Sequence, residues 1–165
     1  MSSSTPEALT AAVLTVSDSC ARGDRTDVSG PAVAELLRQR NFGVVGSEIV
    51  PDEQVAIQKA ILYWVREARL VVTTGGTGVA ERDVTPEATR ATCERLIDGV
   101  AERMRFEGAK KTPLAALSRG VCGVRGRSVI LNLPGSPNGA VESLQAVIDV
   151  LPHALQLLSG NTRHT

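Results

Sequence analysis

The chain has 165 residues, of which 42% are hydrophobic and 22% charged, and this balance suits a single globular domain able to bury a full core. Eighteen basic and eighteen acidic side chains cancel, and only one tryptophan, one tyrosine and two phenylalanines could stack on bases, which argues against a nucleic-acid-binding protein and against attraction to an anionic membrane. The cysteines, Cys20, Cys93 and Cys122, are odd in number and far apart, so neither a disulfide framework nor a zinc site is indicated.

The first half of the chain alternates short apolar runs with amphipathic segments, which predicts β-α-β units. Asn41 and Gly43 supply a stop signal for the first long helix, and Asp52 is a natural N-cap for the second. Such units imply a mainly parallel sheet, whose ligands gather beyond the carboxyl ends of the strands. The expected segments are a strand at 11–16, a polar loop at 17–29, a helix from Gly30, a strand at 44–50, a helix opened by 51–53 and a strand at 69–74.

The third strand runs directly into a glycine-rich turn, a charged loop and a helix start. Gly75, Gly76 and Gly78 let the backbone turn sharply and approach a ligand closely. Thr85 is a good N-cap residue and Pro86 suits the first helical position, so the positive end of a helix faces this loop. The segment is not a Walker loop, which ends in Gly-Lys-Ser/Thr, and it lacks the third glycine of the dinucleotide fingerprint.

Arg82 and Asp83 lie between the glycines and the helix start. Three glycines alone are explained equally well as a tight structural connection. A structural turn needs no such charges, whereas nucleotide chemistry needs a cation beside phosphate and a carboxylate beside a metal ion. The two charged residues therefore favour a phosphate site.

The second half of the chain predicts helices around an antiparallel hairpin. Arg125-Gly126 is a plausible tight turn between two apolar runs, so part of the sheet should be antiparallel. Pro152 separates the two amphipathic closing helices. After the Thr85 helix the chain continues through 98–111, and the expected segments that follow are a helical turn opened by Thr112-Pro113, strands at 121–124 and 127–133, and helices at 138–150 and 153–158.

These elements predict an α/β protein with a mostly parallel sheet and a small antiparallel hairpin. We expect one domain at residues 11–159, between a flexible tail at 1–10 and a C-terminal tail at 160–165. Residues 1–9 lack the apolar core of a signal peptide, and no run of about 18 apolar residues could span a bilayer. We therefore expect a cytoplasmic protein without a membrane partner.

Polar residues follow four predicted strands, at the edge where parallel strands end together. Taken singly, each is explained better as a helix cap, a turn residue or a solvated charge. As a set they indicate one active site, where Asp18, Asp52 and Asp83 could share a divalent cation with substrate phosphates, as is usual for magnesium. The four loops are Ser17-Asp18, 51–53, 75–87 and 132–136.

His153 and His164 are the only histidines. His153 follows Pro152 near an apolar helix, where a packing or capping role is a better interpretation than general-base catalysis. We therefore expect chemistry that does not depend on histidine.

Short motifs occur in order at 13–20, 29–30, 49–53, 70–89, 112–114, 117–119, 121–126, 132–136 and 151–153. They include Val-Leu-Thr-Val-Ser-Asp-Ser-Cys, Ile-Val-Pro-Asp-Glu, the glycine loop with Arg-Asp-Val-Thr-Pro-Glu-Ala, and Asn-Leu-Pro-Gly-Ser. Through these motifs the chain resembles the molybdopterin adenylyltransferases of molybdenum cofactor biosynthesis, which include the bacterial enzyme and the G domains of gephyrin and its plant counterpart. The resemblance covers residues 11–159, and so many ordered motifs make it specific.

The resemblance implies a three-layer α/β/α fold, assembly as a homotrimer, and Mg²⁺-dependent transfer of AMP from ATP to the terminal phosphate of molybdopterin, with release of pyrophosphate. It also implies hand-over of the product to a molybdate-inserting enzyme. In this family the aspartates that match Asp52 and Asp83 are important for turnover, and the loop matching 74–78 contributes to phosphate binding. The turn matching 132–136 borders the bound substrate.

These roles are chemically reasonable because the nucleophile is already an anion, so the protein mainly positions two phosphates and neutralises developing charge. Asp52 and Asp83 are expected to hold magnesium rather than abstract protons. Arg82 and Arg119 are expected to pair with phosphate oxygens. The expected binding residues are Ser17, Asp18, Thr74, Gly75, Gly76, Thr77, Gly78, Arg82, Thr85, Glu87, Ser118, Arg119, Asn132, Pro134, Gly135 and Ser136.

Related branches of the fold leave alternatives. The branch usually called MoaB keeps the glycine loop but can lack the aspartate matching Asp52, which is present here. The one departure from the pattern is Glu81, where a proline often precedes the Arg-Asp pair. Molybdate-inserting enzymes typically carry a different glycine string and extra domains. We therefore expect adenylation, and the alternatives are a protein that binds molybdopterin or a nucleotide without turnover and a scaffold domain that trimerises.

Overall fold

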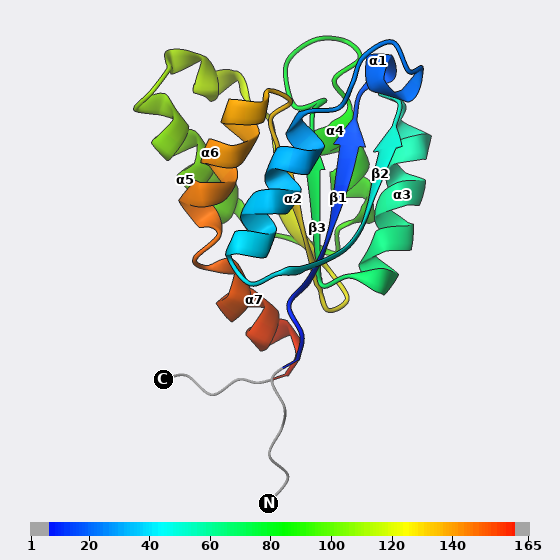
Figure 1. Ribbon diagram of the computed structural model, residues 1–165. Coiled ribbons are helices and arrows are strands. Elements are labelled where there is room, and N and C mark those ends of the chain that lie inside the picture. Colours follow the sequence, from blue (N-terminus) through cyan, green and yellow to red (C-terminus); the bar gives the residue numbers. More distant parts are fainter. Residues whose placement is uncertain (1–6, 161–165) are drawn as a thin grey trace, which may run out of the picture.

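The computed structural model describes residues 7–160, which form a six-stranded mixed sheet between two layers of helices (Figure 1). The strand order is β2-β1-β3-β6-β5-β4. Neighbours among β2, β1, β3 and β6 run parallel, while β5 is antiparallel to both β6 and β4. The strands are β1 (Thr10–Val16), β2 (Gly43–Val50), β3 (Leu70–Thr74), β4 (Arg95–Leu96), β5 (Cys122–Arg125) and β6 (Ser128–Leu133). The predicted α/β fold with an antiparallel hairpin is confirmed.

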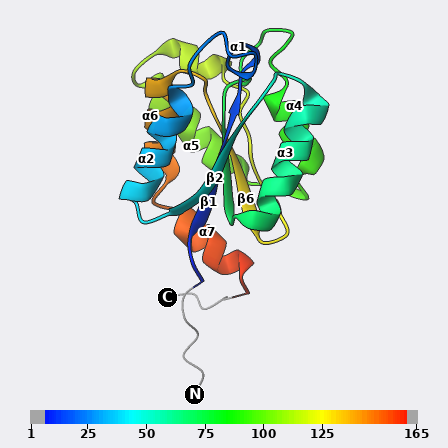
Figure 2. The same cartoon turned by 45° about the vertical axis from the view of Figure 1, so that its right-hand side comes forward.

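Helices cover both faces of this sheet, and the turned view in Figure 2 separates the two layers. The helices are α1 (Asp18–Ala21), α2 (Ser29–Gln39), α3 (Gln54–Glu67), α4 (Thr85–Thr92), α5 (Asp98–Ala109), the 3₁₀ turn η1 (Pro113–Leu117), α6 (Pro137–Val147) and α7 (Leu151–Leu158). Side chains of α2, α5, α6 and α7 share one apolar cluster, and those of α3 and α4 share another. This is the three-layer α/β/α arrangement that the sequence resemblance implies.

The central strands separate the two apolar clusters. Along β1, Ala11 and Val13 belong to one cluster and Leu14 and Val16 to the other, because successive side chains of a strand point to opposite faces. Every residue of β3 and β6 is buried, as is typical of parallel strands covered on both sides. The carboxyl ends of these strands are therefore fixed by packing from both layers.

Several local predictions hold. Thr112 caps η1 by accepting a hydrogen bond from the amide of Leu114 at 3.2 Å. The hairpin turn contains Gly126 with φ +57°, a conformation that favours glycine. The helix that was expected to stop at Asn41 ends at Gln39 with Arg40 as its C-cap, and Asn41 follows with φ +68°.

Other local predictions were wrong. Asp52 and Thr85 do not cap their helices, because the N-cap positions belong to Glu53 and Val84 and neither side chain makes a capping bond. Pro152 does not separate two helices but lies in the first turn of α7, where a missing N–H costs nothing. The one-turn helix α1 and the two-residue strand β4 were not predicted, since both are too short to show a period.

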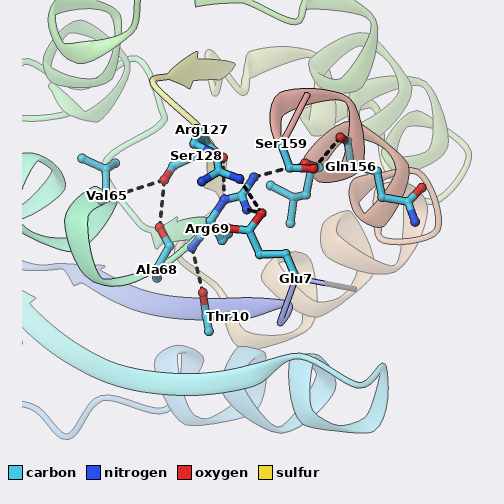
Figure 3. A network of polar contacts seen from close by, with 10 residues as sticks. Glu7, Thr10, Val65, Ala68, Arg69, Arg127, Ser128, Gln156 and Ser159 are labelled. Atoms are coloured by element: carbon cyan, nitrogen blue, oxygen red, sulfur yellow. Dashed lines mark hydrogen bonds and ion pairs between the residues drawn. The ribbon is translucent and has the colours of Figure 1, made fainter. Parts of the chain in front are cut away.

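An arginine ties the start of β3 to both ends of the described chain (Figure 3). Arg69 donates hydrogen bonds to the carbonyl oxygens of Arg127, at 2.7 Å, and Leu155, at 3.1 Å. Its guanidinium also pairs with Glu7 at 2.5 Å, and Glu7 in turn pairs with Arg127 at 2.7 Å. One side chain therefore holds α7, the hairpin and the segment before β1 together.

The first strand begins one residue before the expected start at residue 11. β1 begins at Thr10, and the carbonyl oxygen of Leu9 accepts a hydrogen bond from the amide of Gly43 at 2.8 Å. The rest of the expected tails, residues 1–6 and 161–165, lies outside the described residues, as does His164. Within residues 7–160, every helix is too short or too polar to cross a membrane.

Replacing Arg69 by lysine is expected to lower the free energy of unfolding by about 1–3 kcal/mol, because an ammonium cannot bridge two carbonyl oxygens and a carboxylate as a planar guanidinium does. Urea unfolding followed by circular dichroism measures this change. Arg66→Lys is the matched control, since Arg66 is exposed in the last turn of α3 and its substitution should stay within about 0.5 kcal/mol. An unchanged midpoint for the Arg69 variant would contradict the tethering role.

Candidate functional site

The loops after β1, β2, β3 and β6 meet at one edge of the sheet, above the arrowheads in Figure 1. Strand register explains this, since Val16 pairs with Val50, and Thr74 pairs with both Thr15 and Leu133. The four polar loops that follow these strands therefore start side by side, as the sequence predicted.

The glycine loop makes its close turn with two left-handed residues. Gly75 has φ +90° and Gly76 has φ +69°, a region that L side chains rarely adopt. A β-carbon on Gly76 would overlap Thr85 Oγ1 and lie 3.2 Å from Asp52 Oδ1. Thr85 closes the turn, because its hydroxyl donates to the carbonyl oxygen of Gly75 at 3.0 Å and its amide to that of Gly76 at 3.1 Å.

Gly78 is required for space and not for its backbone angle. A β-carbon there would lie 2.7 Å from Asp83 Oδ2. The same carboxylate oxygen accepts a hydrogen bond from the amide of Ala80 at 3.0 Å. The missing side chains of Gly76 and Gly78 thus allow Asp52 and Asp83 to lie directly against the loop backbone.

Asp18 and Asp52 hold two strand-end loops together through reciprocal hydrogen bonds. The amide of Asp18 donates to Asp52 Oδ2 at 2.9 Å, and the amide of Asp52 donates to Asp18 Oδ1 at 3.0 Å. Arg82 adds two bonds to Asp18, from Nε at 2.6 Å and from Nη2 at 3.0 Å. Hydrogen bonding by Arg82 lowers the pKa of Asp18, so Asp18 stays ionised and its charge is paired.

Asp52 has the opposite electrostatic environment. Its burial raises its pKa, and the charges of Asp18 and Asp83 raise it further, while the Asp18 amide and Arg82 oppose the shift. Two neighbouring carboxylates that repel each other in a partly buried place favour a bound cation. The pair Asp52 and Asp83 therefore fits Mg²⁺, which usually takes one or two protein carboxylates together with substrate phosphates.

The expected three-aspartate cation site does not form. Across residues 7–160, no group of three histidine, cysteine or acidic side chains lies close enough to hold a metal ion. Asp18 is bound instead by the guanidinium of Arg82 and by the amide of Asp52. Sequence spacing could not reveal this pairing, because the partners are far apart along the chain.

Two adjoining cavities open at this edge of the sheet. The larger, about 700 Å³, lies between the glycine loop and a wall made by α5, η1 and α6. The smaller, about 390 Å³, lies beside the ends of β1 and β3 and the loop before α2. They share the four lining residues Gly76, Asp83, Gly135 and Ser136. Two ligands bound in these cavities would therefore meet beside Asp83.

The cavity walls differ in chemistry. The larger cavity has apolar side chains such as Met104, Leu114 and Leu117. Its charged lining residues are Arg105, Lys111, Asp83, Glu107 and Glu142, of which Lys111 and Glu142 form an ion pair at 3.1 Å. The smaller has polar lining residues that include Ser17, Arg25, Thr26, Asp27 and Asp52. The first therefore suits a bulky, partly apolar molecule and the second a more polar one.

The expected site residues fall into two groups. Thirteen of the expected residues line one or both cavities, whereas five do not and instead join the loops to one another. The lining residues are Ser17, Asp52, Thr74, Gly75, Gly76, Thr77, Gly78, Asp83, Ser118, Asn132, Pro134, Gly135 and Ser136. The residues outside the lining are Asp18, Arg82, Thr85, Glu87 and Arg119.

Asn132 combines a place on the cavity wall with a structural role. Its buried side-chain amide donates to the hydroxyls of Thr73, at 3.0 Å, and Thr89, at 2.9 Å, and accepts from the amide of Val121 at 3.1 Å. Ser136, at the junction of the cavities, caps α6 by accepting from the amide of Gly139 at 3.1 Å. The bonds of Asn132 join β6 to β3, to α4 and to the residue before β5, and the bond of Ser136 fixes the start of α6.

Sequence reasoning did not identify the outer walls of the cavities. The α5, η1 and α6 residues in the larger cavity read as ordinary amphipathic segments, and a hydrophobic helix face is more often core. In the loop before α2, the acidic residue Asp27 shortly before the helix start could have indicated a role at the site. Its carboxylate accepts hydrogen bonds from Thr15 Oγ1 at 2.8 Å and from the amide of Gly30 at 3.1 Å. His153 is exposed on α7, and this helix lies at the opposite end of the sheet from the loops after β1, β2, β3 and β6 (Figure 1).

Comparison with known proteins agrees with this geometry. The family described as "Probable molybdopterin binding domain" matches residues 12–153. The molybdopterin adenylyltransferase of Helicobacter pylori strain J99 is 42% identical, over 90% of this chain and 87% of that protein. The crystal structure of the molybdopterin biosynthesis enzyme MoaB from Thermus thermophilus is 53% identical with a TM-score of 0.87, covering 92% of this chain and 97% of that one.

A longer relative contains a similar domain. The molybdenum cofactor synthesis protein cinnamon of Drosophila melanogaster is 44% identical over 94% of this chain, which spans 26% of the cinnamon sequence. With a family match over residues 12–153 and relatives of this similarity, the chain belongs to the molybdopterin-binding domain family of molybdenum cofactor biosynthesis.

Proposed function

We propose that this chain is a molybdopterin adenylyltransferase, which transfers AMP from ATP to the terminal phosphate of molybdopterin and releases pyrophosphate. The observation that carries the proposal is the pair of cavities that share Asp83 and Ser136. The Helicobacter pylori relative, which bears that enzyme name, covers nearly all of the chain. An enzyme that joins two substrates through their phosphates needs two adjoining pockets with a phosphate site between them.

The larger cavity would take molybdopterin and the smaller one ATP. A tricyclic ring system fits the apolar wall of α5 and η1. Arg105 adds a positive charge to this wall, whereas Lys111 is paired with Glu142 at 3.1 Å. The polar loop before α2 and the strand ends suit a nucleotide. In this arrangement the terminal phosphate of molybdopterin and the α-phosphate of ATP lie beside the shared residues.

The chain's own groups would position these phosphates. Residues of the glycine loop and Ser136, the N-cap of α6, line the junction, where the positive end of a helix favours negative charge. Magnesium held by Asp52 and Asp83 would neutralise charge on the phosphate oxygens. The nucleophile is an anion, so no side chain has to remove a proton. Catalysis would therefore rest on orientation and charge neutralisation, without histidine.

Other expectations from the sequence stay predictions. They are assembly as a homotrimer, a cytoplasmic location, and hand-over of the product to a molybdate-inserting enzyme. Analytical ultracentrifugation of the purified chain decides the first of them.

The experiment that tests the proposal measures pyrophosphate release from ATP and magnesium, with and without molybdopterin. The wild type is expected to release pyrophosphate only when molybdopterin is present. Asp83→Asn is expected to keep the fold and lose turnover by about 100-fold or more, since a metal-binding charge is worth several kcal/mol in the transition state. Asp149→Asn is the matched control, because Asp149 is 60% exposed and pairs only distantly with Arg103.

The same assay separates the alternatives. Saturable molybdopterin binding without pyrophosphate release would favour a binding protein that lacks turnover. Absence of both binding and release would refute the enzyme and favour the scaffold domain. Normal specific activity in an Asp83→Asn protein that merely melts earlier would remove Asp83 from the proposed site.

Arg82 gives a prediction about pH. Its guanidinium lowers the pKa of Asp18 by hydrogen bonding and lowers the pKa of Asp52 by its charge. Arg82→Gln should therefore raise both carboxyl pKa values, and a carboxyl group with a raised pKa becomes protonated earlier as the pH falls. If ionised Asp52 is needed, the acid limb of kcat/KM moves to higher pH in Arg82→Gln and stays in place in Arg66→Gln. A limb that does not move would contradict this electrostatic coupling.

A further inference from the structure

The segment between Gly78 and Asp83 has little apolar packing to hold it. Residues 79–82 are exposed and form turns instead of a helix or strand, and Val79 is 68% exposed. Asp83 ends this segment and lines both cavities. Polar contacts must therefore set the position of Asp83.

Arg119 makes those contacts from the loop after η1. Its Nε donates to the carbonyl oxygen of Gly78 and its Nη2 to that of Asp83, both at 2.7 Å. Its own amide donates to the carbonyl oxygen of Thr77 at 2.8 Å. One residue thus grips the segment at both ends.

Glu87 is the partner of the third guanidinium nitrogen of Arg119. Arg119 Nη1 forms an ion pair with Glu87 Oε1 in the first turn of α4, the helix that follows the loop. Each guanidinium nitrogen therefore has a partner within the protein, and the positive charge of Arg119 is paired. Neither Arg119 nor Glu87 lines a cavity, so neither is placed to meet a substrate phosphate.

We propose that Arg119, held by Glu87, is a positioning residue that fixes the segment 78–83 and thereby aims the Asp83 carboxylate at the junction of the two cavities. The proposal rests on the adenylyl transfer proposed above. It replaces the sequence-based expectation that Arg119 binds substrate phosphate. Small displacements of a catalytic group can lower rates by about 100-fold, so a residue that only fixes a loop can control turnover.

Hydrogen bonds to both its main chain and its side chain fix the position of Asp83. Arg119 holds its main-chain carbonyl oxygen, and the amide of Ala80 holds its carboxylate at 3.0 Å. The amide of Asp83 in turn donates to the carbonyl oxygen of Ala80 at 3.0 Å. Releasing Arg119 would therefore loosen the turn that orients the carboxylate.

The test compares Arg119→Lys with wild type in the pyrophosphate assay. A lysine keeps the charge but cannot bridge two carbonyl oxygens and a carboxylate. We expect kcat to fall about 10-fold or more while the KM values for ATP and molybdopterin change less than about threefold. A large increase in the KM for molybdopterin at unchanged kcat would overturn the proposal and make Arg119 a substrate ligand.

Glu87→Gln removes the charge of the other member of the Arg119–Glu87 ion pair, and it distinguishes a positioning role of Arg119 from a phosphate-binding role. If Arg119 positions the loop, Glu87→Gln lowers kcat, and the double variant with Arg119→Lys is little worse than the worse single variant. If Arg119 were a phosphate ligand, loss of Glu87 would free its charge and tighten substrate binding. Tighter binding with unchanged kcat would therefore overturn the proposal.

Arg69→Lys is the matched control. Arg69 also bridges two backbone carbonyl oxygens and a glutamate, but at the opposite end of the sheet (Figure 3). Its substitution should lower stability by a similar amount and leave kcat unchanged. Equal losses of kcat in both variants would show a general effect on folding and overturn the positioning role.

Hydrogen exchange provides a readout that needs no turnover. The amides of Ala80 and Asp83 should exchange faster in Arg119→Lys than in wild type and be unchanged in Arg69→Lys. If wild type releases no pyrophosphate but this exchange pattern holds, the proposed function fails while the grip of Arg119 on the loop stands. Unchanged exchange in Arg119→Lys would refute the grip whatever the enzyme does.

Discussion

The close packing of the Gly75–Gly76 turn against neighbouring strand ends is the constraint on which the site depends. A β-carbon on Gly75 would overlap the carbonyl oxygen of Val16, and the Gly75 amide donates to the carbonyl oxygen of Leu133 at 3.1 Å. The turn is therefore wedged between the ends of β1 and β6, and only glycine fits its left-handed angles. Because the turn lies so deep, Asp52 can approach Gly76 and the two cavities can share their floor.

Charge pairing around this turn leaves two carboxylates available to substrate. Asp18 is paired with Arg82, and Glu87 is paired with Arg119, so these four charges stabilise loops. Asp52 and Asp83 lack an arginine partner among the described residues and face the cavities. The pKa of Asp52 is raised because burial and the neighbouring acidic side chains disfavour its charged form. An ion pair on each side of the turn thus fixes its geometry, while Asp52 and Asp83 stay available for the cation proposed above.

The central sheet could be predicted because its signals are local: β-branched apolar runs, the hairpin at Gly126, and strand-end polar residues that converge by register. The failures depend on partners distant in sequence. Asp52 has the residue type of an N-cap, but its carboxylate binds an amide 34 positions away. Arg119 was expected to bind substrate phosphate, and we propose a positioning role instead because its Nε donates to the carbonyl oxygen of Gly78, 41 positions earlier. No local sequence pattern distinguishes the expected roles of Asp52 and Arg119 from the observed contacts, because residue propensities do not include tertiary contacts.

The floor and the outer wall of the cavities differ in how closely their residues are packed. The floor is built from strand ends and glycine turns, where a single added carbon overlaps a neighbour. The outer wall of the larger cavity is built from α5, η1 and α6, whose exposed Leu114 and Leu117 meet no such limit. Substitution on the wall can therefore alter the shape of the larger cavity, whereas substitution on the floor disturbs the junction of the two cavities. Arg119 connects the two, because it follows the wall element η1 and holds the loop that carries Asp83.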